Sequence, residues 1–278
     1  ENEAPNISPK TVWPEDQLRY NGHYPYGNEI VISYSVQGRA VLESPKLQQI
    51  GEIPVIHHRL TIQPGQNPLE LIVIDEKPEI KEQVAISGHS IAWLQTKNQD
   101  IKFRSSDNGK LVLQIPSSKS TLHLNIALAH DESNTVQTKT PSYQVTNLLD
   151  KTKGGPRRWQ TTHTLKGRLA TSTFQGYVLD SITVPLKNAY NSWMRTSSLA
   201  FFPDGRLAVG TLPGDVWIVS GINDELDKVT WQRFAAGLYE PLGMKVVDGV
   251  LTAITRGRIV KLHDYNNDGE ADFYEALF

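Results

Sequence analysis

The chain has 278 residues, enough for two domains of ordinary size. Hydrophobic residues make up 38% and charged residues 21%, a composition that excludes a disordered chain. The 28 basic and 30 acidic residues give a net charge of −2, which argues against a nucleic-acid-binding protein. No apolar run approaches the roughly 20 residues that a spanning helix needs, so we expect no membrane span.

Cysteine is absent. Its absence excludes disulfides, thiolate catalysis, cysteine-ligated zinc and covalently attached haem c within these residues. The first residues, Glu-Asn-Glu-Ala-Pro, resemble no signal peptide, so the sequence either never had one or begins after its removal. Because Thr, Ser, Asn and Gln are plentiful and methionine is rare, we expect an exported protein, periplasmic or extracellular.

Short runs rich in β-branched residues or alternating at period two fill residues 29–130. Turn sequences separate them, and Asp107–Gly109 (Asp-Asn-Gly) is typical of a hairpin. This spacing predicts an antiparallel β-sandwich over residues 29–130, preceded by an N-terminal extension of residues 1–28. The predicted strands are Glu29–Val36, Ile53–Ile62, Leu69–Ile74, Ile91–Gln95, Ile101–Arg104, Lys110–Ile115 and Leu122–Leu128.

The strand pattern stops between residues 131 and 160, which we interpret as a linker or a long surface crossing. Residues 151–158 (Lys-Thr-Lys-Gly-Gly-Pro-Arg-Arg) are basic and rich in turn formers. Such a cluster could bind a polyanion, but basic side chains in a loop are usually only solvated.

A repeat with a period of about 43 residues follows. Each unit contains four short strands with an Asp-Gly turn and a Gly-centred turn. This number of strands and this repeat length are typical of a β-propeller blade. We therefore expect an all-β chain in which residues 161–278 form a partial propeller of two blades. The remaining blades would come from the same or another chain, and the predicted strand Gly176–Pro185 would latch the closed ring. The matching segments are 203–209 with 247–253, 214–219 with 257–262, and 230–235 with 272–277.

Residues 264–275 match the full pattern D-x-[DN]-x-[DN]-G-x5-E of a calcium-binding loop. Calcium takes six to eight oxygen ligands, which alternating carboxylates and amides supply, and Gly269 permits the sharp turn. The flanks are predicted strands, not the helices of an EF-hand, so the direction of Glu275 stays open. The alternative is an Asx-rich turn without metal. The candidate ligands are Asp264, Asn266, Asp268, Glu270 through its carbonyl, Asp272 and Glu275.

No residue pattern identifies a catalytic or a cofactor-binding site. The eight histidines include no pair at i, i+4, and the adjacent His57 and His58 must point to opposite faces of a strand. The sequence has no nucleophile elbow, no phosphate-binding glycine loop and no dinucleotide fingerprint.

Several segments resemble one family of large exported bacterial proteins. These are dehydrogenases with a glucose/sorbosone-dehydrogenase-like propeller, abundant in planctomycetes and often fused downstream to a c-type cytochrome. The blade motifs carry the resemblance, and a weaker likeness in the sandwich and linker extends it over about residues 29 to 278. The similar blade segments are Phe201–Val219, Trp231–Arg233, Gly237–Gly249 and Leu262–Glu275, with Asp180–Pro185 and Trp193–Arg195 at the entry to the first blade. The weaker similarity covers Val31–Gly38, Val41–Pro45, Pro54–Arg59 and Gly154–Trp159.

The resemblance implies an exported, calcium-bearing propeller with a redox role on a sugar- or alcohol-type substrate. The family's haem c lies in a downstream region outside these residues, and a quinone such as PQQ would need the central funnel of a closed ring. No catalytic residue carries over, because fold alone does not establish function. The alternative, from a different class, is a non-catalytic carbohydrate- or protein-binding protein with the sandwich as its binding module.

Overall fold

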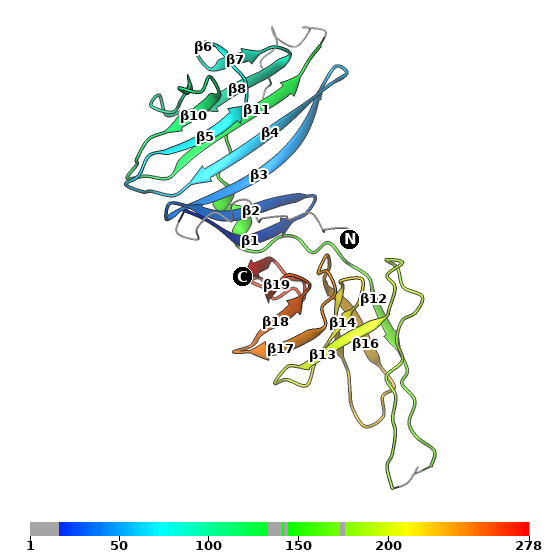
Figure 1. Ribbon diagram of the computed structural model, residues 1–278. Coiled ribbons are helices and arrows are strands. Elements are labelled where there is room, and N and C mark those ends of the chain that lie inside the picture. Colours follow the sequence, from blue (N-terminus) through cyan, green and yellow to red (C-terminus); the bar gives the residue numbers. More distant parts are fainter. Residues whose placement is uncertain (1–16, 133–140, 142–143, 173–175, 278) are drawn as a thin grey trace, which may run out of the picture. The chain divides into compact units, whose positions relative to one another are not determined.

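The computed structural model describes residues 17–132, 141, 144–172 and 176–277 (Figure 1). The chain forms two compact units. One comprises Glu1–Asn21 and Glu29–Asp150, and the other comprises Gly22–Asn28 and Lys151–Phe278. All sheets are antiparallel, and the one helical element of the described residues is the short 3-10 helix Leu148–Thr152. The all-β class predicted from the sequence is therefore confirmed.

The first unit consists of two antiparallel sheets whose inner faces share one apolar core. In the larger sheet the order is β2-β3-β4-β11-β8-β7-β6, and in the smaller it is β5-β10-β9. The bounds in the larger sheet are β2 (Glu29–Val36), β3 (Arg39–Ile50), β4 (Ile53–Ile62), β6 (Glu79–Lys81), β7 (Val84–Ser87), β8 (Ser90–Thr96) and β11 (Leu122–His130). The smaller sheet contains β5 (Leu69–Ile74), β9 (Lys102–Ser105) and β10 (Leu111–Ile115).

Side chains alternate between the two faces of the strands, as predicted for β4, whereas β3 is a strand that the sequence did not predict. β3 pairs with β4 from Val41 opposite Ile62 to Ile50 opposite Ile53, so every second residue faces the smaller sheet. The expected Asp-Asn-Gly hairpin joins β9 to β10. Apolar burial on both inner faces is what holds the two sheets together.

The N-terminal extension contains a strand that the sequence did not predict, β1 (Leu18–Tyr26). Its second half belongs to the second unit, where Gly22 pairs with Glu275 and His23 pairs with Tyr274. A side chain at Gly22 would lie 2.2 Å from the carbonyl oxygen of Tyr274, so this close approach requires glycine. The first sixteen residues of the extension lie outside the described residues.

The second unit contains two successive four-stranded meanders, which confirms the strand content of the predicted repeat. A fifth strand pairs with the last strand of each meander: β12 in the first and the second half of β1 in the second. The first meander is β13 (Thr196–Phe201), β14 (Leu207–Thr211), β15 (Val216–Ser220) and β16 (Val229–Ala235), with β12 (Thr162–Leu165). The second is β17 (Gly243–Val247), β18 (Val250–Thr255), β19 (Arg258–His263) and β20 (Phe273–Ala276).

The two meanders pack face to face around one core, in which Ala208 and Ile218 of the first meet Leu251 and Val260 of the second. Their first strands, β13 and β17, lie side by side (Figure 1). Within the described residues the meanders do not close into a ring.

The predicted strand Gly176–Pro185 is not a regular strand in its described part. Ser181 forms one isolated bridge with Arg168, while Ile182 and Val184 pack against the outer core of the first meander. The alternating apolar residues therefore fill a core without forming a ladder.

The segment expected to be a linker, residues 131–160, is divided between the two units at Asp150 and Lys151. Leu148 is fully buried, and its N–H donates to Thr61 Oγ1 of β4 over 3.1 Å, which ties it to the first unit. From Lys151 onward the chain belongs to the second unit. No helix of the described residues has the length and apolar character to cross a membrane.

Candidate functional site

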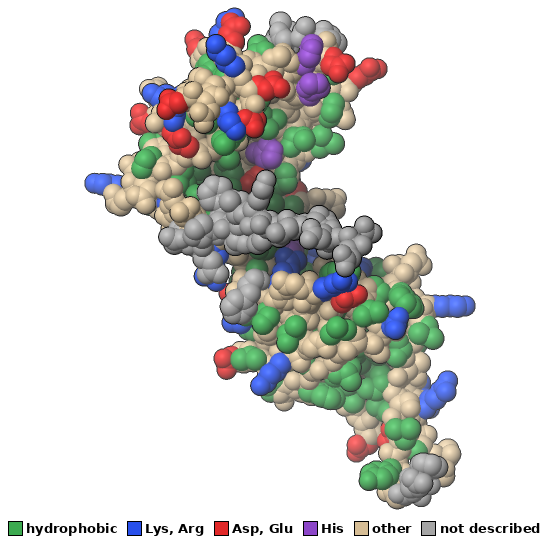
Figure 2. All heavy atoms as spheres, in the orientation of Figure 1, with side chains coloured by type: hydrophobic (Ala, Val, Ile, Leu, Met, Phe, Trp, Pro, Cys, Tyr) green, Lys and Arg blue, Asp and Glu red, His purple; other side chains and the backbone are tan. Residues whose placement is uncertain are grey.

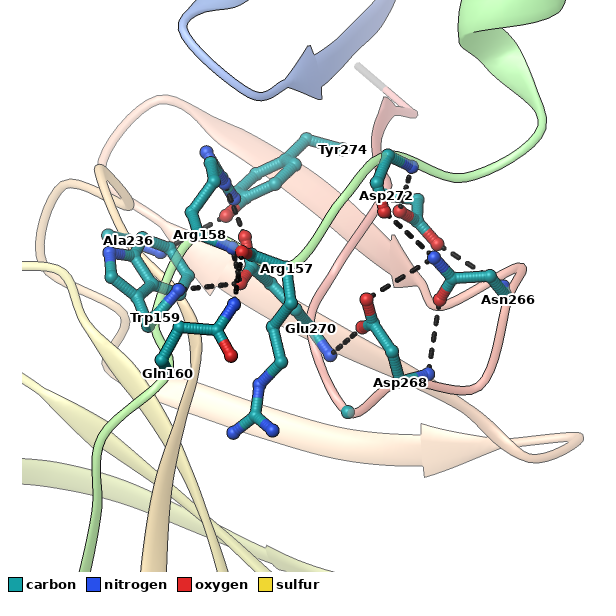
Figure 3. Close-up of polar contacts among 12 residues, drawn as sticks. Arg157, Arg158, Trp159, Gln160, Ala236, Asn266, Asp268, Glu270, Asp272 and Tyr274 are labelled. Atoms are coloured by element: carbon teal, nitrogen blue, oxygen red, sulfur yellow. Dashed lines mark hydrogen bonds and ion pairs between the residues drawn. The ribbon is translucent and has the colours of Figure 1, made fainter.

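The predicted calcium loop connects β19 to β20, and its side chains fold back onto its own backbone (Figure 3). The Asp264 carboxylate accepts hydrogen bonds from the N–H groups of Asp268 (3.2 Å) and Gly269 (2.9 Å). Asn266 Oδ1 accepts from the N–H of Asp268 over 3.1 Å, and Asp268 Oδ1 accepts from the N–H of Glu270 over 2.9 Å. These contacts are those of an Asx-rich turn.

The first meander holds this loop in place. Gln232 of β16 donates to the carbonyl of Gly269 over 2.7 Å, and the N–H of Ala271 donates to the carbonyl of Phe234 over 2.8 Å. Gly269 has a φ of +83°, and a Cβ there would lie 2.3 Å from the Gln232 side chain. Glycine is therefore required at this turn for conformation and for space.

Residues 154–159, here called the arm, contact the loop from another side. The N–H of Gly155 donates to Asp272 Oδ1 over 2.8 Å, and Asn266 Nδ2 donates to the carbonyl of Gly155 over 2.9 Å. Asp272 is only 5% exposed, and its other oxygen accepts from the N–H of Tyr265 over 2.8 Å. The arm thus satisfies a buried carboxylate that the loop alone leaves half bonded.

Glu270 makes the strongest connection between arm and loop. Its side chain is buried, it accepts from the N–H groups of Arg158 (2.7 Å) and Trp159 (3.1 Å), and it forms an ion pair with Arg158 Nε. Two backbone donors and one guanidinium compensate the desolvation of this carboxylate. Figure 3 shows these contacts converging on Glu270.

An aromatic stack continues from the arm. The Trp159 ring has the guanidinium of Arg158 4.4 Å from its centroid and that of Arg233 4.7 Å from it. Arg233 also pairs with the buried Asp215 over 2.5 Å. The ring therefore lies against two cations that each have a carboxylate partner, a cation–π arrangement at a half-buried ring.

The predicted ligands do not all gather in one place. Asp264, Asn266 and Asp268 lie together in the turn, while Asp272 and the side chain of Glu270 face the arm. Glu275 lies on β20, where its carboxylate meets His263 Nε2 over 2.8 Å. Among the described residues, no three acidic or histidine side chains converge as metal ligands would.

Charge is nevertheless concentrated in the turn. Burial raises the pKa of Asp264, and the neighbouring charges of Asp268 and Asp272 raise it further, against hydrogen bonds from backbone N–H groups. The oxygens of Asp264, Asn266 and Asp268 are hard donors that retain free lone pairs, so their chemistry fits a calcium ion.

A hollow of about 550 Å³ opens beside the loop, between the two meanders of the second unit. Its lining mixes aromatic with charged side chains, which suits a polar ligand with one apolar face. The lining includes Phe202, Arg206, His263, Asp264, Tyr265 and Asp268.

The sequence analysis missed the partners of the loop, namely Arg158, Trp159 and Gln232. A basic, glycine-rich segment and an acidic, glycine-rich segment in one chain are complementary in charge, and that signal was available. It could not specify the pairing, because more than a hundred residues separate Arg158 from Glu270.

Comparison with known proteins gives one match. A family model described as a domain of unknown function (DUF6797) matches residues 1–43. This region includes β1, β2 and the start of β3 and contains none of the residues of the candidate site. No curated protein and no solved structure matches the chain.

Proposed function

We propose that the second unit forms the first blades of a β-propeller in an exported protein with a dehydrogenase or electron-transfer role on a sugar- or alcohol-type substrate. The observation that carries the propeller is the packing of two successive four-stranded meanders face to face, with β13 and β17 side by side. Propeller blades follow one another in this way around a central axis.

Exposed apolar side chains on the second unit support further blades. Leu199 and Phe201 of β13, Leu242 before β17 and Ile254 of β18 are each more than half exposed. Figure 2 shows apolar side chains gathered on the visible face of this unit. Exposed apolar surface of this kind is typical of an interface that another element covers, and the remaining blades would cover it.

The redox role and the substrate class rest on two supports of different kinds. One is the resemblance of the blade segments to exported dehydrogenases. The other is the hollow beside the loop, where Phe202 or Tyr265 offers a ring to a sugar face while Arg206 and Asp268 offer polar partners to hydroxyl groups. Haem c and a quinone would be held by regions outside these residues.

Calcium is part of the same proposal. Asp264, Asn266 and Asp268 would supply side-chain oxygens, Glu270 its carbonyl and Asp272 a direct or water-mediated contact. The Glu270 and Glu275 carboxylates are bound to Arg158 and His263, so they are left out of the ligand set. A bound ion would join the turn more firmly to the arm and to Gln232.

The test is an electron-transfer assay on the natural polypeptide that contains this chain. Aldoses, polyols and primary alcohols are offered with dichlorophenolindophenol as the acceptor, and substrate-dependent bleaching is expected for at least one class. Arg206→Gln should raise KM for that substrate and leave kcat within about twofold, because Arg206 lines the hollow without touching a reacting group. The absence of bleaching with every substrate contradicts the redox role.

A non-catalytic binding protein is the second candidate. It is favoured by the open inner face of the first unit, where Leu47 and Ile56 are exposed on β3 and β4. Saccharide or protein binding by the 278-residue chain, with no electron transfer by the natural polypeptide, would support it.

A further inference from the structure

The larger sheet of the first unit has an inner face that the smaller sheet covers only in part. Leu47, Ile56 and Leu128 lie opposite one another on β3, β4 and β11, so they form one row on that face. Leu128 packs against the core, whereas Leu47 is 59% exposed and Ile56 47% exposed. Apolar side chains on this face therefore lie uncovered beyond β5.

The strand that borders the uncovered face has an unguarded edge. Within the described residues β5 pairs with β10 alone, and Leu71 and Ile72 on it are exposed. Proteins usually protect such edges with lysine, proline or unpaired charges. The opposite edge strand of the same sheet, β9, carries Lys102 and Arg104. The one charge of β5, Glu70, is already paired with Arg104.

A groove runs along β5, built from two adjoining hollows of about 390 and 160 Å³ that share Val73 and Leu128. We call it the β5 groove. A strand added to β5 would lie about 4.8 Å from it and about 10 Å above the larger sheet, which are the ordinary spacings of strands and of packed sheets. Every second side chain of that strand would then face Ile56 and Leu128.

The floor of the groove contains one polar cluster. Glu43 accepts hydrogen bonds from Tyr34 Oη over 3.0 Å, and His58 Nδ1 lies 2.7 Å from its other oxygen. Among the residues that line the two hollows, Glu43 is the one carboxylate, and neither lysine nor arginine is present. Each Glu43 oxygen already has one partner and keeps a second lone pair, so a cation on the added strand would add to this cluster and find Glu43 as its single anionic partner.

We propose that the β5 groove receives an extended strand of a partner polypeptide, apolar at alternating positions and carrying one lysine or arginine that faces Glu43. Main-chain pairing with β5 would provide affinity, and the apolar row together with Glu43 would provide specificity. This inference concerns the first unit alone and extends the second candidate function, protein binding by the sandwich, so it does not depend on the propeller or on the redox role.

The probe is a capped heptapeptide, Thr-Val-Thr-Lys-Thr-Val-Thr, titrated into the 278-residue chain and followed by fluorescence anisotropy and by amide hydrogen exchange. The lysine peptide should bind and should slow exchange in Leu69–Ile74. A peptide with Glu in place of Lys should bind roughly fivefold more weakly, the range expected for one partly exposed charge pair. If the lysine peptide does not bind at about 1 mM, the proposal is overturned.

Variants locate the binding site. Leu71→Lys places a charge in the groove and should abolish binding of both peptides. Leu199→Lys makes the same apolar-to-charged change at an exposed position on β13 of the other unit and should leave binding unchanged. Glu43→Gln should remove the difference between the two peptides, and it decides the matter if Leu71→Lys fails to fold. Unchanged binding to Leu71→Lys, or a difference between the peptides that survives in Glu43→Gln, would overturn the proposal.

Discussion

Two buried carboxylates, Glu270 and Asp272, find their partners far away in the sequence. The N–H groups that satisfy them belong to Gly155, Arg158 and Trp159, more than a hundred residues earlier. A buried charge without such donors would be strongly unfavourable. The arm is therefore a structural part of the second unit and not a solvated connection.

Replacing Glu270 tests this directly. Glu270→Gln removes the negative charge beside Arg158, and we expect the free energy of unfolding of the second unit to fall by about 2 kcal/mol. The measurement is urea unfolding followed by tryptophan fluorescence, since four of the six tryptophans lie in this unit, namely Trp159, Trp193, Trp217 and Trp231.

The matched control is Asp204→Asn, which breaks the exposed pair with Arg206. This variant should lower the free energy of unfolding by about 0.5 kcal/mol or less, because solvent screens exposed ion pairs. Equal losses for the two variants would contradict a structural role for the arm.

His23 gives the second unit a predicted sensitivity to acid. Burial, and then the charges of Arg258 and Arg158, lower its pKa from 6.5 to about 4. In the unfolded chain His23 takes up a proton near pH 6.5, whereas in the folded chain it does so only near pH 4. Stability is therefore complete above about pH 6.5 and is lost as the pH falls toward 4, by up to about 3 kcal/mol.

The measurement is urea unfolding at pH 7, 5.5 and 4.5 for the wild type and His23→Gln. The variant should lose less stability over this range than the wild type, whereas His130→Gln, which alters an exposed histidine, should behave as the wild type does. A slope that is identical in the wild type and His23→Gln would show that another group is responsible.

Among the elements, the loop between β19 and β20 carries the calcium prediction. Bound calcium stabilises the folded state by mass action, so excess calcium should raise the melting temperature of the wild type relative to EGTA. Asp268→Ala removes a ligand oxygen and should abolish this rise.

The control for this loop is Asn267→Gly. Asn267 has a φ of +58°, so alanine would add backbone strain at this position and glycine does not. Its calcium response should match that of the wild type. Equal melting temperatures of the wild type in calcium and in EGTA would leave an Asx-rich turn held by its own hydrogen bonds.

The local sequence pattern predicted most of the strands. It could not predict which strands far apart in the sequence pair with each other. Period-two alternation located Glu29–Val36 and Ile53–Ile62 at their observed bounds, because one face of each strand is buried. β1 was missed, since Gly22 and Pro25 interrupt its pattern. The converse error, Gly176–Pro185, arose because apolar alternation also suits an extended segment that packs without a ladder.

For the candidate site, the turn chemistry of Asp264, Asn266 and Asp268 was readable from spacing alone. The direction of Glu270 was not, because it depends on where the arm lies in three dimensions. The sequence shows which groups are charged, whereas burial and partners come only with the fold.

For the whole molecule, we expect self-association. Leu199, Phe201, Leu242 and Ile254 are all more than half exposed on the second unit, and contiguous apolar surface drives contact between copies. Sedimentation velocity over a range of concentrations should show dimers or larger species, and Phe201→Ser with Ile254→Ser should reduce them. A strictly monomeric wild-type chain would contradict self-association through these exposed side chains.

The division of β1 between the two units affects the order in which the chain can fold. Gly22 and His23 leave the ribosome about 250 residues before their partners Glu275 and Tyr274. At 5–20 residues per second this is a delay of roughly 12 to 50 seconds. The first unit can assemble during that time, whereas the second must wait until β20 has been made. Until then the nascent chain carries the second half of β1 without its partner strand, exposed to other chains or to a chaperone.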